Sequence, residues 1–331
     1  MHKSVMAQTT RPSARRGLPG IPPYRVVFPD CTQYMASFHD DRLRALVPEL
    51  EIDITQPSAA AFVARLADAV AVMHFGTRIT ARMLEQCPKL RIIVFLGTGV
   101  GSWVDLAAAA ERSIRVRRVL GYADRTVAEH ALALILGIGR NLAYMDRELR
   151  AGRWRTEARF ETAGKRLGLV GVGGIGRALA ALAAPLGLEV VGWNRSPLAA
   201  DVPCRMLPLD EVIASADIVS LHLALNDETR GIIDRRRIGL LKPGAVLINT
   251  ARGGLIDEAA LLERLQRRDI LAGLDVFADE PLAPEHPITH LDNVTLTAHA
   301  GWMSPEAGRR LFRLGLEAMR EELDRLDDTQ A

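Results

Sequence analysis

The sequence of 331 residues has few cysteines, few aromatic residues and no long apolar run. Its three cysteines, Cys31, Cys87 and Cys204, are too far apart for a CxxC motif or a Cys/His metal site. We therefore expect no metal centre, and reduced thiols as in a cytoplasmic protein. No apolar run reaches the roughly 18 residues that a transmembrane helix needs. The net charge of +2 predicts no nucleic-acid or membrane partner.

Acidic residues are missing from the first 23 residues, which contain four prolines and several basic residues. A basic start without acids can indicate a transit peptide. This stretch lacks a clear amphipathic apolar face, however, so we predict a disordered tail over residues 1–23.

The rest of the chain alternates short apolar runs with helical patterns, which is typical of parallel sheets with crossover helices. The hydrophobic content of 48% and the charged content of 25% are those of an ordinary globular protein. The expected strands of a first domain are 25–28, 51–54, 69–73, 90–95 and 114–119. Those of a second are 167–170, 189–193, 218–223, 245–249, 271–274 and 294–296. We predict an α/β fold with two Rossmann-like or flavodoxin-like parallel-sheet domains and a cleft between them.

A glycine-rich turn follows the apolar run 167–170. Gly171, Gly173 and Gly176 have the G-x-G-x-x-G spacing, and an Ala/Leu-rich helical pattern and a second strand complete a βαβ unit. Glycines at these positions permit a tight turn and the approach of a pyrophosphate to the start of the helix. We therefore predict a dinucleotide-binding turn that also includes Gly174 and Ile175.

The end of the second strand of this unit predicts the cofactor. An NAD site usually has an acidic residue there, which binds the ribose 2′-hydroxyl. Asn194, Arg195 and Ser196 stand there instead, and a guanidinium with a hydroxyl suits a 2′-phosphate. The alternative is a solvated turn. We expect NADP(H) to be preferred, with NAD(H) possible.

Two segments that precede the glycine-rich turn in the chain also have recognisable patterns. Residues 126–152 predict a long helix between the domains, with Thr126 as N-cap and Glu129 at the capping-box position. His130 in this helix is expected to be a packing or capping residue. The glycine-rich stretch Gly97, Thr98, Gly99 ends a strand of the first domain, where backbone N–H groups could bind a carboxylate. A plain βα turn is the alternative.

Three polar residues lie at or beyond strands of the second sheet: Arg252, Glu280 and His299. Each alone has a structural explanation as a surface charge, a turn residue or a capping histidine. Together they suit the interconversion of a 2-oxo acid and a 2-hydroxy acid. A guanidinium binds a carboxylate through paired donors, a histidine exchanges the proton of the alkoxide, and a carboxylate orients the histidine.

Five stretches carry a resemblance to a known family: GVGGIGR (171–177), LHLALNDETRGIID (221–234), LKPGAVLINTARGGLIDEAAL (241–261), AGLDVFADEP (272–281) and NVTLTAHAGW (293–302). The chain resembles the D-isomer-specific 2-hydroxyacid dehydrogenases, a family that includes glyoxylate/hydroxypyruvate reductases and phosphoglycerate dehydrogenases. The resemblance covers roughly residues 24–325.

The resemblance implies roles for these residues. Arg252 binds the substrate carboxylate and carbonyl, His299 is the acid/base, Glu280 pairs with His299, and Asp275 contacts the nicotinamide carboxamide. Thr126 and Thr250 are assigned to the cofactor, and His74, Gly97, Thr98 and Gly99 to the substrate. The implied domains are 24–122 with 302–331 for the substrate and 123–301 for the dinucleotide, in a homodimer built through the cofactor domains.

The chain departs from the family pattern at Ala298 and Ala224, where proline is usual, and at Val100 to Trp103. His74 and Gly76 stand where phosphoglycerate dehydrogenases have arginines for the substrate phosphate, so phosphoglycerate is not the expected substrate. We predict a cytoplasmic reductase of a small 2-oxo acid of the glyoxylate or hydroxypyruvate type. The alternatives are an NAD-linked dehydrogenase of another 2-hydroxy acid and a cofactor-sensing binding protein like the related corepressors.

Overall fold

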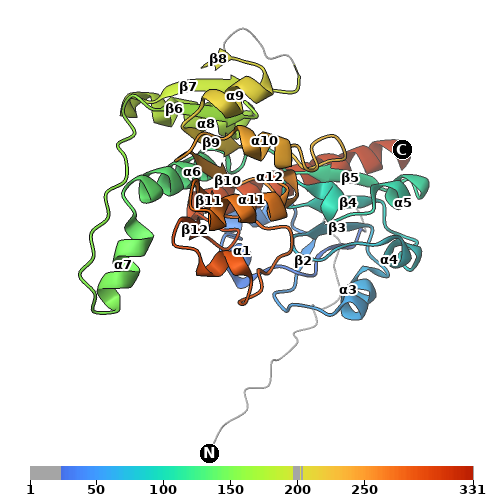
Figure 1. Cartoon of the computed structure of the whole chain (residues 1–331). Coiled ribbons are helices and arrows are strands. Elements are labelled where there is room, and N and C mark those ends of the chain that lie inside the picture. The colour runs from blue at the N-terminus through green and yellow to red at the C-terminus, as the bar shows by residue number, and fades with distance from the viewer. Residues whose placement is uncertain (1–23, 197–201, 203, 331) are drawn as a thin grey trace, which may run out of the picture.

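The computed structural model describes residues 24–196, 202 and 204–330, so the predicted tail 1–23 lies outside the described residues. The described chain forms two parallel sheets joined by long helices (Figure 1). This confirms the predicted class of two parallel α/β sheets.

The first sheet has the strand order β2-β1-β3-β4-β5, which is the flavodoxin-like order. Its strands are β1 (Val26–Phe28), β2 (Leu50–Ile52), β3 (Ala71–His74), β4 (Ile92–Phe95) and β5 (Arg115–Arg118). The helical segments between them are α1 (Gln33–Ala36), α2 (Asp41–Arg44), α3 (Ala59–Leu66), α4 (Ala81–Glu85), η1 (Val100–Ser102) and α5 (Leu106–Glu111). The strands β1, β3 and β4 are fully buried, as expected where helices cover both faces of a parallel sheet.

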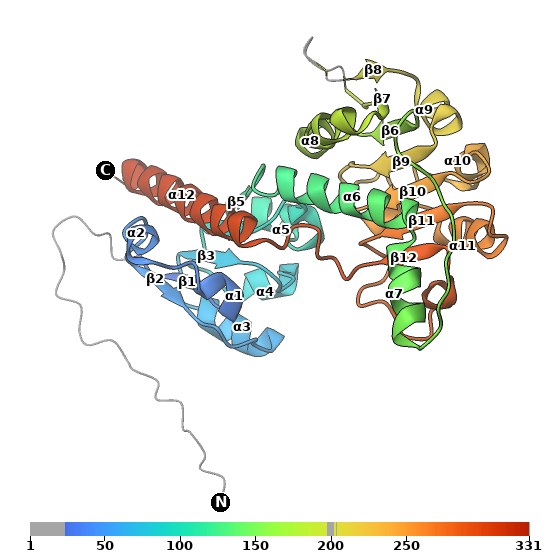
Figure 2. The same ribbon diagram turned by 90° about the vertical axis from the view of Figure 1, so that its left-hand side faces the viewer.

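The last helix, α12 (Pro305–Gln330), returns to this first sheet, and Figure 2 shows it lying along the sheet. Phe312 of α12 stacks on Phe28 of β1, with 6.3 Å between ring centroids. Gly315 lets the helix approach closely, because a Cβ there would lie 2.3 Å from Leu96 Cδ2. One core thus joins residues from both ends of the described chain.

The second sheet has the order β12-β11-β10-β9-β6-β7-β8, with every pair parallel. Its strands are β6 (Arg166–Val170), β7 (Glu189–Trp193), β8 (Arg205–Met206), β9 (Ile218–Leu221), β10 (Val246–Asn249), β11 (Leu271–Leu274) and β12 (Val294–Leu296). The covering segments are α8 (Gly174–Ala183), η2 (Ala184–Leu186), α9 (Leu209–Ser215), α10 (Arg235–Leu240), η3 (Gly253–Leu255), α11 (Glu258–Gln266) and η4 (Pro287–His290). The strand order reverses direction between β6 and β9, which creates a crevice at their carboxyl ends.

The predicted helix over 126–152 is two helices, α6 (Asp124–Gly139) and α7 (Leu142–Arg150). Asn141 lies between them in the left-handed region, with φ of 53°, and interrupts the helical hydrogen bonding. The predicted N-cap was wrong, because α6 begins at Asp124 and Glu129 pairs instead with Arg125 at 2.6 Å. As Figure 1 shows, α7 extends away from both sheets.

Candidate active site

The glycine-rich turn follows β6 and leads into α8. Gly171 has φ of +104°, and a Cβ there would lie 2.7 Å from the carbonyl oxygen of His222, at the end of β9. A Cβ on Gly176 would lie 2.3 Å from the carbonyl oxygen of Gly171. Both positions therefore require glycine. A Cβ on Gly173, the N-cap of α8, would meet no atom within 4 Å, so this side of the turn is open to a ligand.

This turn stands at the crevice between β6 and β9, where a doubly wound sheet binds a dinucleotide. The free N–H groups at the start of α8 suit a pyrophosphate. Ile175 is partly buried against the cores of both sheets, so its side chain packs inward. Thr250, directly after β10, has a buried Oγ1 that makes no hydrogen bond within the described chain. An orphaned polar atom beside this crevice is consistent with a cofactor contact.

The segment after β7 has defined partners. The amide oxygen of Asn194 accepts a hydrogen bond from Val172 N at 3.2 Å, and its Nδ2 donates to Ser196 O at 2.8 Å. Arg195 forms an ion pair with Glu228, and its side chain is about half exposed. Asn194 thus fixes the glycine turn, while the guanidinium that was predicted to bind a 2′-phosphate already faces a carboxylate.

Arg252 follows β10 and reaches the first sheet. A Cβ on Gly99 would lie 2.8 Å from Arg252 Nη2, so the guanidinium lies against the glycine-rich loop 97–99. Asn249 holds the segment by donating to Arg252 O at 2.9 Å and accepting from Ala251 N at 3.0 Å. The two sheets therefore meet at this arginine.

His299 and Glu280 form a hydrogen-bonded pair, with 2.7 Å between His299 Nδ1 and Glu280 Oε2. Phe277 N donates to the other carboxylate oxygen at 3.0 Å, which fixes the orientation of the carboxylate. His299 has φ of 51°, an uncommon backbone conformation for a residue with a side chain. Both side chains remain accessible, at 41% and 34% exposure, so a small substrate can reach the histidine.

Arg252 and His299 lie at one edge of the second sheet, because they follow β10 and β12 and only β11 lies between these strands. The loop that carries Glu280 packs on Gly253, the residue after Arg252, since a Cβ on Gly253 would lie 2.0 Å from the Phe277 carbonyl carbon. The three predicted catalytic residues therefore come from neighbouring strand ends.

Asp275 ends β11 between them and is almost fully buried. Its Oδ1 accepts from Thr297 Oγ1 at 2.6 Å and from Ala300 N at 2.8 Å, and its Oδ2 accepts from Gly301 N at 2.9 Å. Burial raises the pKa of this carboxyl, but the hydrogen bonds from His130, Thr297 and the two backbone groups outweigh burial and hold it below its usual range. Asp275 is thus a carboxylate that organises the loop of His299, and its contact with the nicotinamide remains a prediction.

His130 of α6 extends this network, with 2.9 Å between its Nε2 and Thr297 Oγ1. A side-chain role outside the chemistry was expected for His130. The sequence held no signal for this particular contact, since 167 residues separate the partners.

Two further predicted contacts have partners within the chain. His74, assigned to the substrate, is fully buried at the end of β3; its Nδ1 lies 3.1 Å from Thr77 O, and its Nε2 makes no hydrogen bond within the described residues. The hydroxyl of Thr126, assigned to the cofactor, lies 3.4 Å from Ser304 Oγ, just before α12. Both assignments remain predictions. Of the first-sheet loop, Thr98 is exposed and Gly99 faces Arg252.

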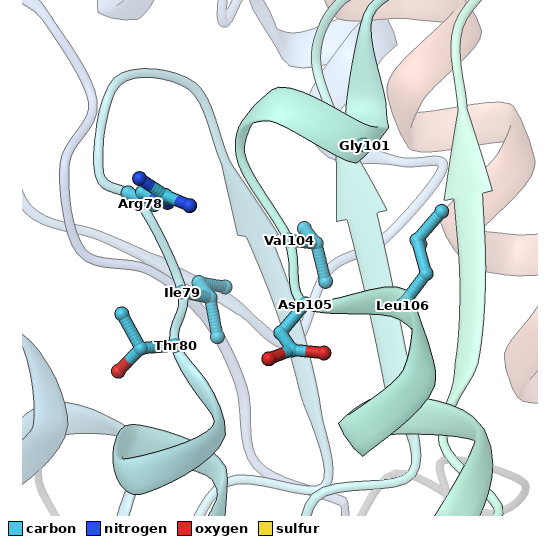
Figure 3. A pocket seen from close by; sticks show the side chains of 7 residues that line it. All are labelled: Arg78, Ile79, Thr80, Gly101, Val104, Asp105 and Leu106. Atoms are coloured by element: carbon cyan, nitrogen blue, oxygen red, sulfur yellow. The ribbon is translucent and has the colours of Figure 1, made fainter. Parts of the chain in front are cut away.

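A separate cavity of about 300 Å³ lies in the first domain, between the loop after β3 and the start of α5 (Figure 3). It is lined by Arg78, Ile79, Thr80, Gly101, Val104, Asp105 and Leu106. None of these belongs to the second sheet, which carries the glycine turn and the His299–Glu280 pair. The cavity is therefore distinct from the candidate active site.

Within residues 24–196, 202 and 204–330, no group of three or more His, Cys, Asp and Glu side chains could hold a metal ion. In the same part of the chain, no helix is long and apolar enough to cross a membrane.

The fold and the glycine turn define a two-domain α/β protein with the crevice of a dinucleotide-binding sheet. The family model for the NAD-binding domain of D-isomer-specific 2-hydroxyacid dehydrogenases matches residues 132–301. The hydroxypyruvate reductase of Thermotoga maritima is 37% identical over 247 residues, which are 73% of this chain and 80% of that protein. The glyoxylate reductase of Korarchaeum cryptofilum is 32% identical, over 80% of this chain and 83% of that protein.

A solved structure has a similar fold: an acyclic imino acid reductase (Bsp5) in complex with NADPH and D-Arg. It superposes with a TM-score of 0.81 at 27% identity, and the match covers 91% of this chain and 97% of that one. The chain belongs to the D-isomer-specific 2-hydroxyacid dehydrogenase family. The predicted family and the predicted class of enzyme, an NAD(P)-dependent oxidoreductase, are therefore confirmed.

Proposed function

We propose that the protein reduces a small 2-oxo acid, of the glyoxylate or hydroxypyruvate type, to the D-2-hydroxy acid with NADPH. The observation that carries the proposal is the His299–Glu280 pair, at 2.7 Å, on the same sheet edge as Arg252. The hydroxypyruvate and glyoxylate reductases among the relatives support this substrate class.

The residues divide the reaction between binding and proton transfer. Arg252 donates one N–H to Ala251 O at 2.6 Å, and its remaining donors bind the substrate carboxylate and carbonyl oxygen. When bound, the reduced nicotinamide supplies the hydride that adds to the carbonyl carbon. His299 uses Nδ1 for Glu280, so its Nε2 donates the proton that the carbonyl oxygen takes up. One hydride and one proton thus convert the oxo acid into the hydroxy acid.

The preference for NADPH depends on Arg195 and Ser196 after β7. A 2′-phosphate provides stronger acceptors than the single carboxylate of Glu228, and both partners of that ion pair are well exposed. The guanidinium can therefore exchange Glu228 for the phosphate. The structurally similar imino acid reductase is in complex with NADPH, which supports this preference.

We also propose that the protein is a cytoplasmic homodimer. Large apolar side chains are exposed on α7 and the segment after it: Leu142 at 56%, Leu149 at 58% and Trp154 at 86%. An apolar surface of this kind on the cofactor-domain side suits a second copy of the chain.

The test is a panel of 2-oxo acids, including glyoxylate, hydroxypyruvate and pyruvate, each offered with NADPH and with NADH. Loss of absorbance of the reduced cofactor and the configuration of the product are measured. We expect turnover of glyoxylate or hydroxypyruvate, faster with NADPH. Cofactor binding without turnover of any acid would favour the binding-protein alternative.

A further inference from the structure

Asp124, the first residue of α6, lies against the start of α8. A Cβ on Gly174 would lie 1.8 Å from Asp124 Oδ2 and 2.6 Å from its Cγ. Gly174 is the first residue of α8, and the preceding Gly173 is its N-cap. The carboxylate therefore stands beside the N–H groups that receive the pyrophosphate of a dinucleotide in this fold. Only a glycine at position 174 leaves room for it.

No residue of the described chain donates a hydrogen bond to the Asp124 carboxylate or forms an ion pair with it. The neighbouring Arg125 pairs instead with Glu129, with 2.6 Å between Nε and Oε1. Burial raises the pKa of Tyr122 to about 12, so its phenol stays neutral. Burial likewise raises the pKa of the Asp124 carboxyl above its ordinary value.

The Asp124 carboxylate and a pyrophosphate are both negatively charged, and both would lie at the start of α8. At separations of a few ångströms inside a cleft, their repulsion is weakly screened. The repulsion disappears when the carboxyl takes up a proton, because a neutral carboxyl can donate a hydrogen bond to a phosphate oxygen.

We propose that Asp124 opposes the pyrophosphate of the cofactor, so that binding of the dinucleotide takes up a proton at this residue. The inference rests on the proposed use of a nicotinamide dinucleotide. Linkage gives the direction of the pH dependence. The bound cofactor favours the protonated carboxyl, so the affinity for cofactor falls as pH rises from the pKa of Asp124 in the free protein to its pKa in the complex. Asp124 thereby sets both the affinity for cofactor and its pH dependence.

The experiment compares the wild type with Asp124→Asn, and uses Glu129→Gln as the matched control. Glu129 is an acid of the same helix, is 56% exposed and pairs with Arg125. The dissociation constants of NADPH, ADP and adenosine are measured by calorimetry across a pH series. Adenosine lacks phosphate, so it separates repulsion of the pyrophosphate from a general change in the pocket.

We expect Asp124→Asn to bind NADPH and ADP about 10- to 100-fold more tightly than the wild type at neutral pH, with a flatter pH profile. Adenosine should bind both proteins equally, and Glu129→Gln should behave as the wild type. Equal affinities of wild type and Asp124→Asn for ADP would overturn the proposal, as would an equal gain for adenosine.

A second measurement needs no variant, in case Asp124→Asn does not fold. Binding of the oxidised cofactor NAD⁺, whose pyrophosphate does not titrate near neutral pH, is followed across the pH series in two buffers of different ionisation enthalpy, which reports the protons taken up. Uptake of a fraction of a proton, largest where the affinity changes most steeply with pH, is expected, and no uptake at any pH would contradict the proposal. Because no 2-oxo acid is present, the result is independent of which acid the enzyme reduces.

Discussion

His299 is prepared for proton transfer by its backbone as well as by its partner. The left-handed φ of 51° and the bond from His299 N to Asp275 O at 2.8 Å fix the loop, and Glu280 fixes the ring. Two buried histidines are different: burial lowers the pKa of His74 and of His222 to about 4, so both rings are neutral near neutral pH. At the scale of single residues, exposure with one oriented nitrogen distinguishes His299.

Replacing His299 with Ala should therefore remove the proton donor and leave the cofactor site intact. We expect kcat to fall by about 10²- to 10⁴-fold, the usual contribution of a positioned general acid. The dissociation constant of NADPH should stay within a factor of about two, because the glycine turn and β7 are unchanged. Steady-state kinetics and a fluorescence titration with NADPH measure the two effects.

His290→Ala is the control for this substitution, since His290 is an exposed histidine of η4. It should retain the wild-type kcat. Glu280→Gln should lose less activity than His299→Ala, because the amide still accepts a hydrogen bond from the ring. A near-normal kcat in His299→Ala would refute the assignment of the general acid.

The proposed cofactor preference depends on one element, the segment after β7. Removing the charge of Glu228 by Glu228→Gln should free Arg195 for a 2′-phosphate. An exposed ion pair contributes about 0.2–1 kcal/mol, so kcat/KM for NADPH should rise by about 1.5- to 5-fold while that for NADH stays constant.

Arg195→Ala should lower the preference for NADPH by about 10- to 100-fold, since a hydrogen bond to a charged group contributes about 1.5–3 kcal/mol.

Both variants are measured with both cofactors. An Arg195→Ala enzyme that keeps the wild-type ratio of NADPH to NADH would show that the guanidinium does not contact the cofactor. The control Arg236→Ala removes an arginine that pairs with Asp210 instead, and it should leave the ratio unchanged.

Strands could be predicted from the sequence where the hydrophobic pattern alone determines their bounds. The strands β7, β11 and β12 have their predicted bounds, because each is a short apolar run with polar turn residues on both sides. The strand β8 was missed, since two exposed residues, Arg205 and Met206, carry no periodicity. The ion pair of Arg195 with Glu228 and the position of Asp124 against Gly174 were also missed, because both depend on how distant segments pack and no residue spacing indicates them.

Glu322 illustrates a tertiary contact of this kind at the scale of an element. It is 1% exposed on α12, and it accepts from Arg115 and Arg117 of β5 at 2.6 Å each. Burial raises the pKa of its carboxyl, and the bonds from Arg117 and Arg115 outweigh burial, so the pKa lies below its usual range. The pair anchors the last helix to the edge of the first sheet.

Glu322→Gln should lower the free energy of unfolding by about 1.5–3 kcal/mol, because it weakens charged hydrogen bonds in a buried position. A depressed pKa stabilises the fold above the pKa of the unfolded chain, about 4.3, and this contribution disappears as pH falls through the folded pKa. The difference between wild type and variant in urea unfolding should therefore shrink towards acid pH. Glu321→Gln, at a 56% exposed neighbour, should have little effect.

At the scale of the whole molecule, the candidate active site exists only because two sheets meet. The loop 97–99 comes from the first sheet and Arg252 from the second, and α6 and the return into α12 connect them. At the start of α12, Arg310 donates to Tyr122 O at 2.8 Å, which ties the two connecting segments together. Small shifts between the sheets would change the distance from Arg252 to the loop before they changed the rest of the site.

Gly99→Ala tests the contact between Arg252 and the loop 97–99 directly. The added Cβ would lie 2.8 Å from Arg252 Nη2, which is the far end of a flexible side chain, so the guanidinium should move while the fold persists. We expect KM for the 2-oxo acid to rise about tenfold and kcat to fall, because a misplacement of about 1 Å can cost up to about 10²-fold. The dissociation constant of NADPH and the Tm should stay unchanged.

The control Gly101→Ala adds the same methyl group two residues on, where its nearest neighbour would be Leu106 Cδ1 at 3.9 Å, and it should behave as the wild type. If both variants kept the wild-type KM, the substrate would not lie between Arg252 and this loop, and the cleft between the sheets would have to bind it elsewhere.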